Sequence, residues 1–172
     1  MSPDSHEDPD ITHLRQAIDL AARARTRGDH PFGSLLVAPD GSVVAEAMNS
    51  VDTAGDPTGH AETNVVRAVG HLDLDTRAEL TLYTSTEPCA MCAGALQAAR
   101  VSSVVFGAFE PKTGACGSLI DVLRAPTAPF TPQVRGGVLE EECAALLRNF
   151  FGEVPENLIF IPNISYPTDI DL

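Results

Sequence analysis

The sequence predicts an α/β fold in which a mixed β-sheet is covered by helices on both faces. Segments with helical periodicity alternate with short apolar segments along most of the chain, and this alternation is typical of an α/β sandwich. The first two strands are joined by a turn and should run antiparallel, whereas strands joined through helices should run parallel. The length of 172 residues and the 44% of hydrophobic residues are those of one globular domain.

The first half of the chain supplies two helices and a hairpin. Residues 11–27 place apolar side chains at helical spacing, which predicts the first helix. Residues 33–49 contain two apolar runs around the turn residues 39–41 (Pro-Asp-Gly), which indicates a β-hairpin. In residues 59–70 three valines share one helical face, so a second helix is predicted there.

The second half continues the alternation. Residues 79–85 ("ELTLYTS") predict a strand, and residues 88–100 predict a helix with proline at its first position. Residues 103–108 ("SVVFGA") are apolar enough for a strand buried on both faces. Residues 109–133 are loop-rich, with a short helix expected around "SLIDVL". A last strand is expected in "QVRGGVL" and a last helix at 139–151.

We expect one domain over residues 11–151, because no internal repeat and no linker of biased composition interrupts the chain. Residues 1–10 are acidic and polar and are predicted to form a flexible tail. Residues 152–172 form a C-terminal extension whose three prolines prevent it from being one long helix.

The formal net charge of −13 argues against a nucleic-acid partner. Phosphate backbones are bound by many lysines and arginines, and this chain has eleven in all. Four arginines crowd the first predicted helix. A solvated helix face is the simpler interpretation of them, and a local phosphate-binding patch is the alternative. They are Arg15, Arg23, Arg25 and Arg27.

The chain is expected to be cytoplasmic, with no membrane partner. No apolar run approaches the roughly 20 residues that cross a bilayer, and the N-terminus lacks the basic and apolar segments of a secretory signal. In that compartment a C-x-x-C pair indicates metal or redox chemistry more often than a disulfide.

Cys89 and Cys92 are such a pair, and His60 is their expected partner. Residues three apart share one helical face, so both sulfurs can point at one ion. The helix start also favours thiolates, which are the form that binds zinc. A redox pair or two buried thiols are the alternatives for the cysteines, and a capping or core residue is the alternative for the histidine.

Three protein ligands predict a catalytic site with one zinc ion per chain. Catalytic zinc sites keep a position for water, whereas structural sites are closed by four protein ligands. Glu62, two residues after His60, is placed to move a proton between that water and a leaving group. A structural site would need a fourth ligand, for which the candidates are His30, His71, Cys116 and Cys143.

The pattern H-x-E followed by P-C-x-x-C is the signature of zinc nucleobase deaminases, and "HAE" and "PCAMC" match it. With "HPFGSLLV", "LYTSTEPCAMCAGAL" and "KTGACGSLIDVL", residues 11–151 resemble the cytidine deaminase superfamily, in the branch of guanine, cytosine and tRNA adenosine deaminases. The resemblance implies a five-stranded mixed sheet in a three-layer α/β/α sandwich and a homodimer. It also implies a set of substrate-binding residues: Phe32, Asn49, Ala61 and Pro88.

The resemblance implies a zinc-dependent aminohydrolase that releases ammonia from a small amino-heterocycle: a guanine-like purine, cytosine, a nucleoside or a triazine. "PFG" and "DPTGHAETN" are similar to the enzymes of free bases and nucleosides, and the segment after Phe151 has no lysine or arginine. In guanine deaminases that segment closes the active site, sometimes across a dimer, and Phe160 and Tyr166 are candidates for such a role here. The alternatives are a tRNA adenosine deaminase and a non-catalytic protein that keeps zinc for stability.

Overall fold

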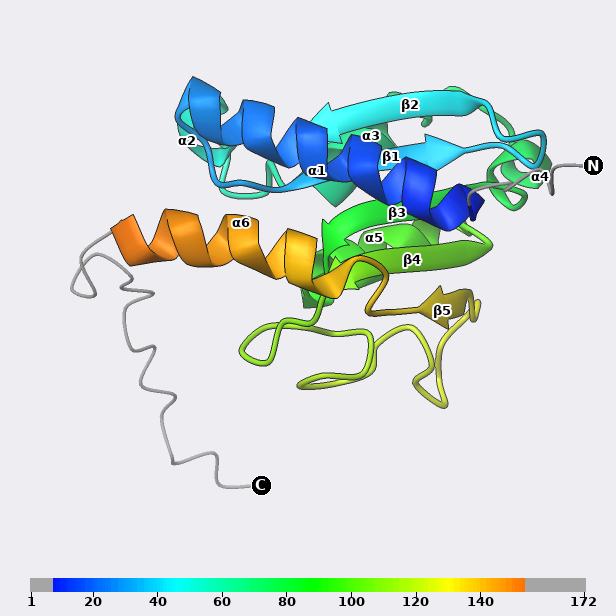
Figure 1. The fold of residues 1–172 in the computed structure, drawn as a ribbon. Coiled ribbons are helices and arrows are strands. Elements are labelled where there is room, and N and C mark those ends of the chain that lie inside the picture. The colour runs from blue at the N-terminus through cyan, green and yellow to red at the C-terminus, as the bar shows by residue number, and fades with distance from the viewer. Residues whose placement is uncertain (1–7, 154–172) are drawn as a thin grey trace, which may run out of the picture.

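The computed structural model describes residues 8–153 and contains a five-stranded mixed sheet in the order β2-β1-β3-β4-β5 (Figure 1). β1 is antiparallel to β2 and β3, whereas β3, β4 and β5 are parallel. The strands are β1 (Gly33–Val37), β2 (Val43–Met48), β3 (Thr81–Thr86), β4 (Ser103–Ala108) and β5 (Gln133–Arg135). The helices are α1 (Pro9–Arg27), α2 (Val51–Ala54), α3 (Ala61–Ala68), α4 (Leu74–Arg77), α5 (Ala90–Ala99) and α6 (Glu140–Glu153). The predicted α/β class and mixed sheet are confirmed.

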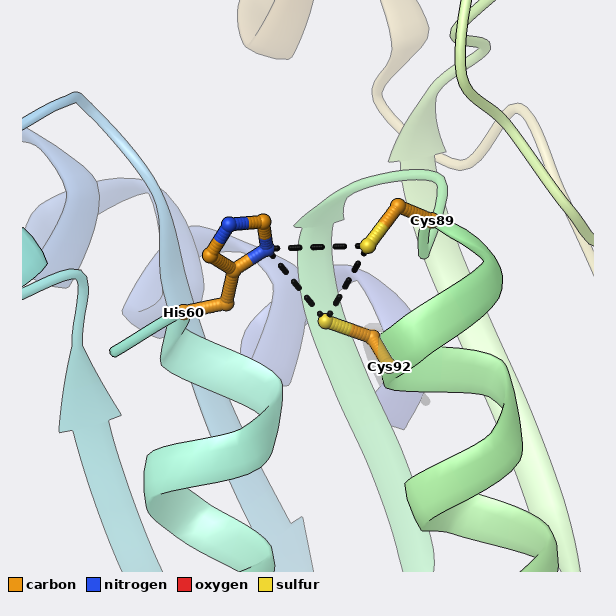
Figure 2. A group of neighbouring side chains, drawn as sticks. All are labelled: His60, Cys89 and Cys92. Carbon is orange, nitrogen blue, oxygen red and sulfur yellow. Dashed lines mark hydrogen bonds between the residues drawn. The ribbon is translucent and has the colours of Figure 1, made fainter. Parts of the chain in front are cut away.

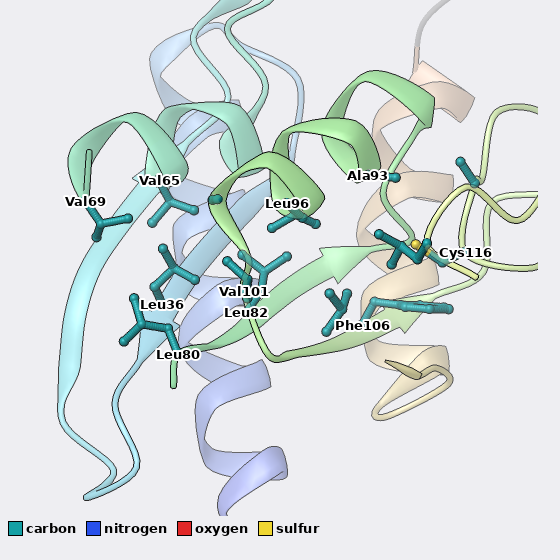
Figure 3. Close-up of a cluster of buried hydrophobic side chains, with 14 residues drawn as sticks. Leu36, Val65, Val69, Leu80, Leu82, Ala93, Leu96, Val101, Phe106 and Cys116 are labelled. Carbon is teal, nitrogen blue, oxygen red and sulfur yellow. The ribbon is translucent and has the colours of Figure 1, made fainter. Parts of the chain in front are cut away.

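Helices cover both faces of the sheet, and alternating strand residues supply the two cores. On one face Leu36 pairs with Leu82 and Leu82 with Val104, and these side chains pack with residues of α3 and α5 (Figure 3). On the other face Leu35 pairs with Tyr83 in a second cluster that includes residues of α1 and α6. The two clusters form the three-layer sandwich that the resemblance implied.

Two predicted helix starts and one predicted helix need correction. α1 begins at Pro9, where the Asp8 carboxylate caps the helix by accepting a hydrogen bond from the Asp10 N–H. The first residues of α1 had been predicted to belong to the flexible tail. The helix predicted from residue 88 begins at Ala90, because Cys89 is its N-cap. No helix forms around "SLIDVL". The Val122 N–H, which a helix would pair with the Ser118 carbonyl, donates instead to the Ala115 carbonyl at 2.9 Å.

Two short helices, α2 and α4, escaped the sequence analysis. Each has four residues, so neither contains enough turns to show a helical period. The C-terminal extension lies outside the described residues from 154 onward, as do Phe160 and Tyr166. Within residues 8–153, no helix is both long and apolar enough to cross a membrane.

Gly33 allows α1 to lie directly on β1. A Cβ atom at this position would stand 2.5 Å from the Leu20 Cβ and 2.6 Å from the Ala21 N, and both neighbours belong to a packed helix. The contact between α1 and β1 therefore depends on the absence of a side chain at residue 33.

We predict that Gly33→Ala destabilises the fold by about 1–3 kcal/mol, because overpacking of a filled interface forces backbone shifts. Urea unfolding measures the change. The matched control is Gly94→Ala in α5, where a Cβ would meet nothing within 4 Å; it should be neutral or stabilise by up to about 1 kcal/mol, since alanine favours helices. Equal stability of the two variants would contradict the close approach at Gly33.

Candidate active site

Two helices on the same face of the sheet bring the predicted metal ligands together. α3 and α5 contact each other, and their first turns lie at the same edge of the sheet (Figure 2). His60 is the N-cap residue of α3 and Cys89 is the N-cap residue of α5, and neither side chain caps its own helix. Both side chains instead point toward each other and toward Cys92 from the first turn of α5.

The three side chains form a compact group. The His60 Nδ1 atom lies 3.6 Å from the Cys89 Sγ and 3.5 Å from the Cys92 Sγ, and the two sulfurs are 3.6 Å apart. Tetrahedral ligands held at about 2.0–2.3 Å from zinc stand roughly 3.3–3.8 Å apart. The donor types and their separations therefore fit a zinc ion. Among the described residues, no other histidine or cysteine joins this group.

One of the three ligands, Cys89, favours the thiolate form that binds zinc. Its hydrogen bond with Cys92, and then the one with His60, lower the pKa of Cys89 to about 4. The same contact with Cys89, and then burial, raise the pKa of Cys92. The Cys89 hydrogen bond also raises the pKa of His60. A thiolate at Cys89 is thus stabilised even before a metal is considered, and helix N-termini add to this stabilisation.

Glu62 lies beside the group with its carboxylate almost without solvent contact. The residue is 5% exposed. Its Oε1 accepts a hydrogen bond from the Thr84 hydroxyl at 2.9 Å, and its Oε2 accepts one from the Cys92 thiol at 3.5 Å. Burial raises the pKa of Glu62 above its ordinary value. A buried carboxyl group with a raised pKa holds a proton more readily than an exposed one, which suits a group that takes up and returns a proton.

A cavity of about 70 Å³ opens onto His60, Cys89 and Glu62. Phe32, which the sequence analysis proposed as a pocket residue, also lines it. Four further lining residues end or follow β3 or β4: Thr86, Glu87, Glu110 and Thr113. They were missed as site residues, although the segments that carry the family resemblance contain three of them. Their common signal is position, since all lie at the carboxyl ends of parallel strands, where ligands bind in α/β sheets.

The three remaining candidates lie around this cavity but not among its lining residues. Ala61 is the first residue of α3 and Pro88 precedes Cys89; both are buried. Asn49 is also buried; its Oδ1 accepts a hydrogen bond from the Val51 N–H at 3.1 Å. Because the amide oxygen is already bonded, the NH₂ group of Asn49 is the part of the side chain that remains to donate a hydrogen bond to a ligand. That these three residues bind substrate stays a prediction.

The segment that carries Asn49 is held by Asp29, a second residue that the sequence analysis missed. Asp29 is fully buried. Its carboxylate accepts hydrogen bonds from the Asp52 and Thr53 backbone N–H groups, the Thr53 hydroxyl and the Arg27 guanidinium. Burial raises its pKa, but the bonds from Thr53 and Arg27 bring it below the ordinary value. Arg27 also donates to the Asn49 carbonyl at 2.6 Å, so one ion pair fixes this side of the site.

Comparison with known proteins agrees with this geometry. The family described as "Cytidine and deoxycytidylate deaminase zinc-binding region" matches residues 7–108. The chain is 40% identical over 149 residues to a tRNA-specific adenosine deaminase of Bacillus subtilis (strain 168), covering 84% of this chain and 90% of that protein. It is 38% identical over 165 residues to a probable cytosine deaminase of Schizosaccharomyces pombe, covering 88% and 98%.

A solved structure from a study of A-to-I editing by tRNA:A34 deaminases is similar, with a TM-score of 0.72 and 35% identity over 78% of this chain and 98% of that one. The matched family region contains His60, Glu62, Cys89 and Cys92. The chain therefore belongs to the cytidine and deoxycytidylate deaminase family, and it is a zinc-dependent deaminase.

Proposed function

We propose that the protein deaminates a free amino-heterocycle, such as a guanine-like purine, cytosine, a nucleoside or a triazine. The carbon that carries the amino group gains an oxygen from water, the carbon–nitrogen bond breaks, and ammonia leaves. The observation that carries this proposal is the buried Glu62 beside a three-ligand group, in a cavity that no lysine or arginine lines.

His60, Cys89 and Cys92 would hold the zinc ion, and the ion supplies Lewis-acid activation of water. Glu62 accepts the proton that the attacking water loses and returns a proton to the departing nitrogen. The hydroxyl of Thr84 donates to one Glu62 oxygen. This bond leaves the other oxygen directed toward the metal group, where it already meets Cys92.

The surroundings of the cavity favour an uncharged ring over a nucleic-acid loop. Three lining residues are glutamates, and no lining residue is a lysine or arginine. The arginines of α1 do not line the cavity. Arg27 is bound to Asp29, and Arg23 lies 3.8 Å from Glu46. A polyanion would find no lysine or arginine among the lining residues to bind its phosphates.

A tRNA adenosine deaminase is the second candidate, because several of the similar proteins carry that activity in their names. Both substrates would place only a base in the cavity, so the chemistry at Glu62 would be the same. The difference lies in what binds outside the cavity. The homodimer and the cytoplasmic location implied earlier stay predictions, and the apolar segment "NLIFIP" lies outside the described residues.

The first test concerns the metal. We predict that Cys92→Ala loses the zinc ion and lowers the thermal stability, because a site with two remaining ligands cannot hold it. Metal analysis and thermal unfolding of the purified chain measure both effects. Cys143→Ala is the matched control, since this buried cysteine packs in the core of the opposite face. It should lose some stability and keep one zinc per chain; zinc retained by Cys92→Ala would refute the ligand assignment.

The second test concerns the proton. We predict that Glu62→Gln keeps the zinc and the fold but lowers kcat by about 100- to 10,000-fold, because an amide cannot move a proton. Ammonia release measures the rate. The control is Glu79→Gln, which removes one charge at an exposed position and should leave the rate unchanged. Turnover of Glu62→Gln near the parent rate would place the proton carrier elsewhere.

The third test separates the two substrates. We predict ammonia release from at least one free base, nucleoside or triazine, at a rate that stays level from low to physiological salt. Deamination of tRNA should depend steeply on salt, since it requires phosphate contacts. If tRNA alone is accepted, and reversal of Arg15, Arg23 and Arg25 to glutamate abolishes that activity, the free-base proposal is wrong. Arg27 is left unchanged, because its ion pair with Asp29 holds the site.

A further inference from the structure

Glu87 lines the cavity, yet its carboxylate has no acceptor capacity left for a substrate. The residue is 4% exposed. Its Oε1 accepts the N–H groups of Cys116 and Ser118, each at 3.0 Å. Its Oε2 accepts the N–H of Glu110 at 3.0 Å and the hydroxyl of Ser118. A carboxylate offers about four lone-pair sites, so this one is saturated.

All four donors belong to one loop, residues 110–118. Loop residues Glu110 and Thr113 line the cavity together with Phe32 and His60. No named helix or strand lies between β4 and β5, so this loop is held by isolated backbone and side-chain contacts. Glu87 supplies such an anchor from the segment between β3 and α5.

The same loop is joined to the turn that carries the metal ligand. The Ala115 N–H donates to the Pro88 carbonyl at 2.8 Å, and Gly114 forms an isolated β-bridge with Cys89. A Cβ atom on Gly114 would stand 2.5 Å from a Glu87 carboxylate oxygen. The carboxylate thus packs directly on the loop backbone, and this approach requires glycine at residue 114.

We propose that Glu87 is a positioning residue that fixes the 110–118 loop against the Cys89 turn and so sets the shape of the substrate cavity. It acts through the loop and does not touch the substrate. The inference rests on the proposed deamination of a small ring, because that reaction needs a wall that excludes solvent and holds the ring beside Glu62.

Glu87→Gln in the full zinc-loaded chain tests the proposal. An amide replaces one acceptor oxygen by an NH₂ group, which faces loop donors and cannot accept from them. We expect faster hydrogen–deuterium exchange at the backbone amides of Glu110, Cys116 and Ser118. We also expect KM to rise about tenfold. That factor corresponds to the free energy of one lost hydrogen bond to a charged group. The zinc content should remain one per chain and kcat should change much less, because the loop contributes equally to ground-state and transition-state binding.

Two further variants make the test specific. Gly114→Ala should change exchange and KM in the same direction as Glu87→Gln, because its Cβ would clash with the Glu110 carbonyl oxygen, would stand 2.5 Å from the Glu87 carboxylate, and would push the loop and the carboxylate apart. Ser118→Ala removes one donor and leaves three, so it should give a smaller change in the same direction even if Glu87→Gln folds poorly. Glu79→Gln again controls for the loss of one negative charge and should change neither quantity.

Unchanged exchange at all three amides in Glu87→Gln would overturn the proposal, whatever the substrate is. A fall in kcat at constant KM would also overturn it, because it would place Glu87 in the proton transfer. Loss of zinc from Glu87→Gln would overturn it as well, since the role of Glu87 would then be to support the metal site and not to shape the cavity. If the parent releases ammonia from no heterocycle, the proposed function fails, and the exchange and zinc measurements still decide the role of Glu87.

Discussion

The packing of α3 beside α5, with both N-termini at one edge of the sheet, is the constraint on which the site depends. Each helix gives up a side-chain cap at its first position: His60 and Cys89 are the N-cap residues and neither bonds its own helix. A serine or aspartate at such a position contributes about 0.5–2 kcal/mol. The sequence forgoes that stability twice, in order to place a nitrogen and a sulfur 3.6 Å apart. Metal binding would compensate for this loss, which couples the fold to the ion.

Three buried carboxylates surround the site, and the number of donors on each one separates their roles. Asp29 and Glu87 each accept four hydrogen bonds. Burial raises the pKa of both, but their hydrogen bonds outweigh it and leave each pKa below its ordinary value. Glu62 accepts one bond from a hydroxyl and one from a thiol, and burial raises its pKa. The saturated carboxylates hold walls in place, whereas the poorly satisfied one can exchange a proton.

The parts of the structure that local sequence patterns encode could be predicted. Alternating apolar segments gave the sandwich, and the spacing of His60, Cys89 and Cys92 gave the three side chains that the fold brings together. The anchors were not predictable, because their partners are distant in sequence. Asp29 reaches residues 23 and 24 positions away, and Glu87 reaches residues 23 to 31 positions away.

Zinc-edge X-ray absorption of the purified, zinc-loaded chain tests the central claim most directly. The account predicts two sulfur neighbours at about 2.3 Å and two lighter neighbours at about 2.0–2.1 Å. Multiple scattering should come from a single imidazole, which leaves one position for a non-protein oxygen. A third sulfur or a second imidazole would mean a fourth protein ligand. That result would describe a closed structural site and would contradict a catalytic role for the group at His60, Cys89 and Cys92.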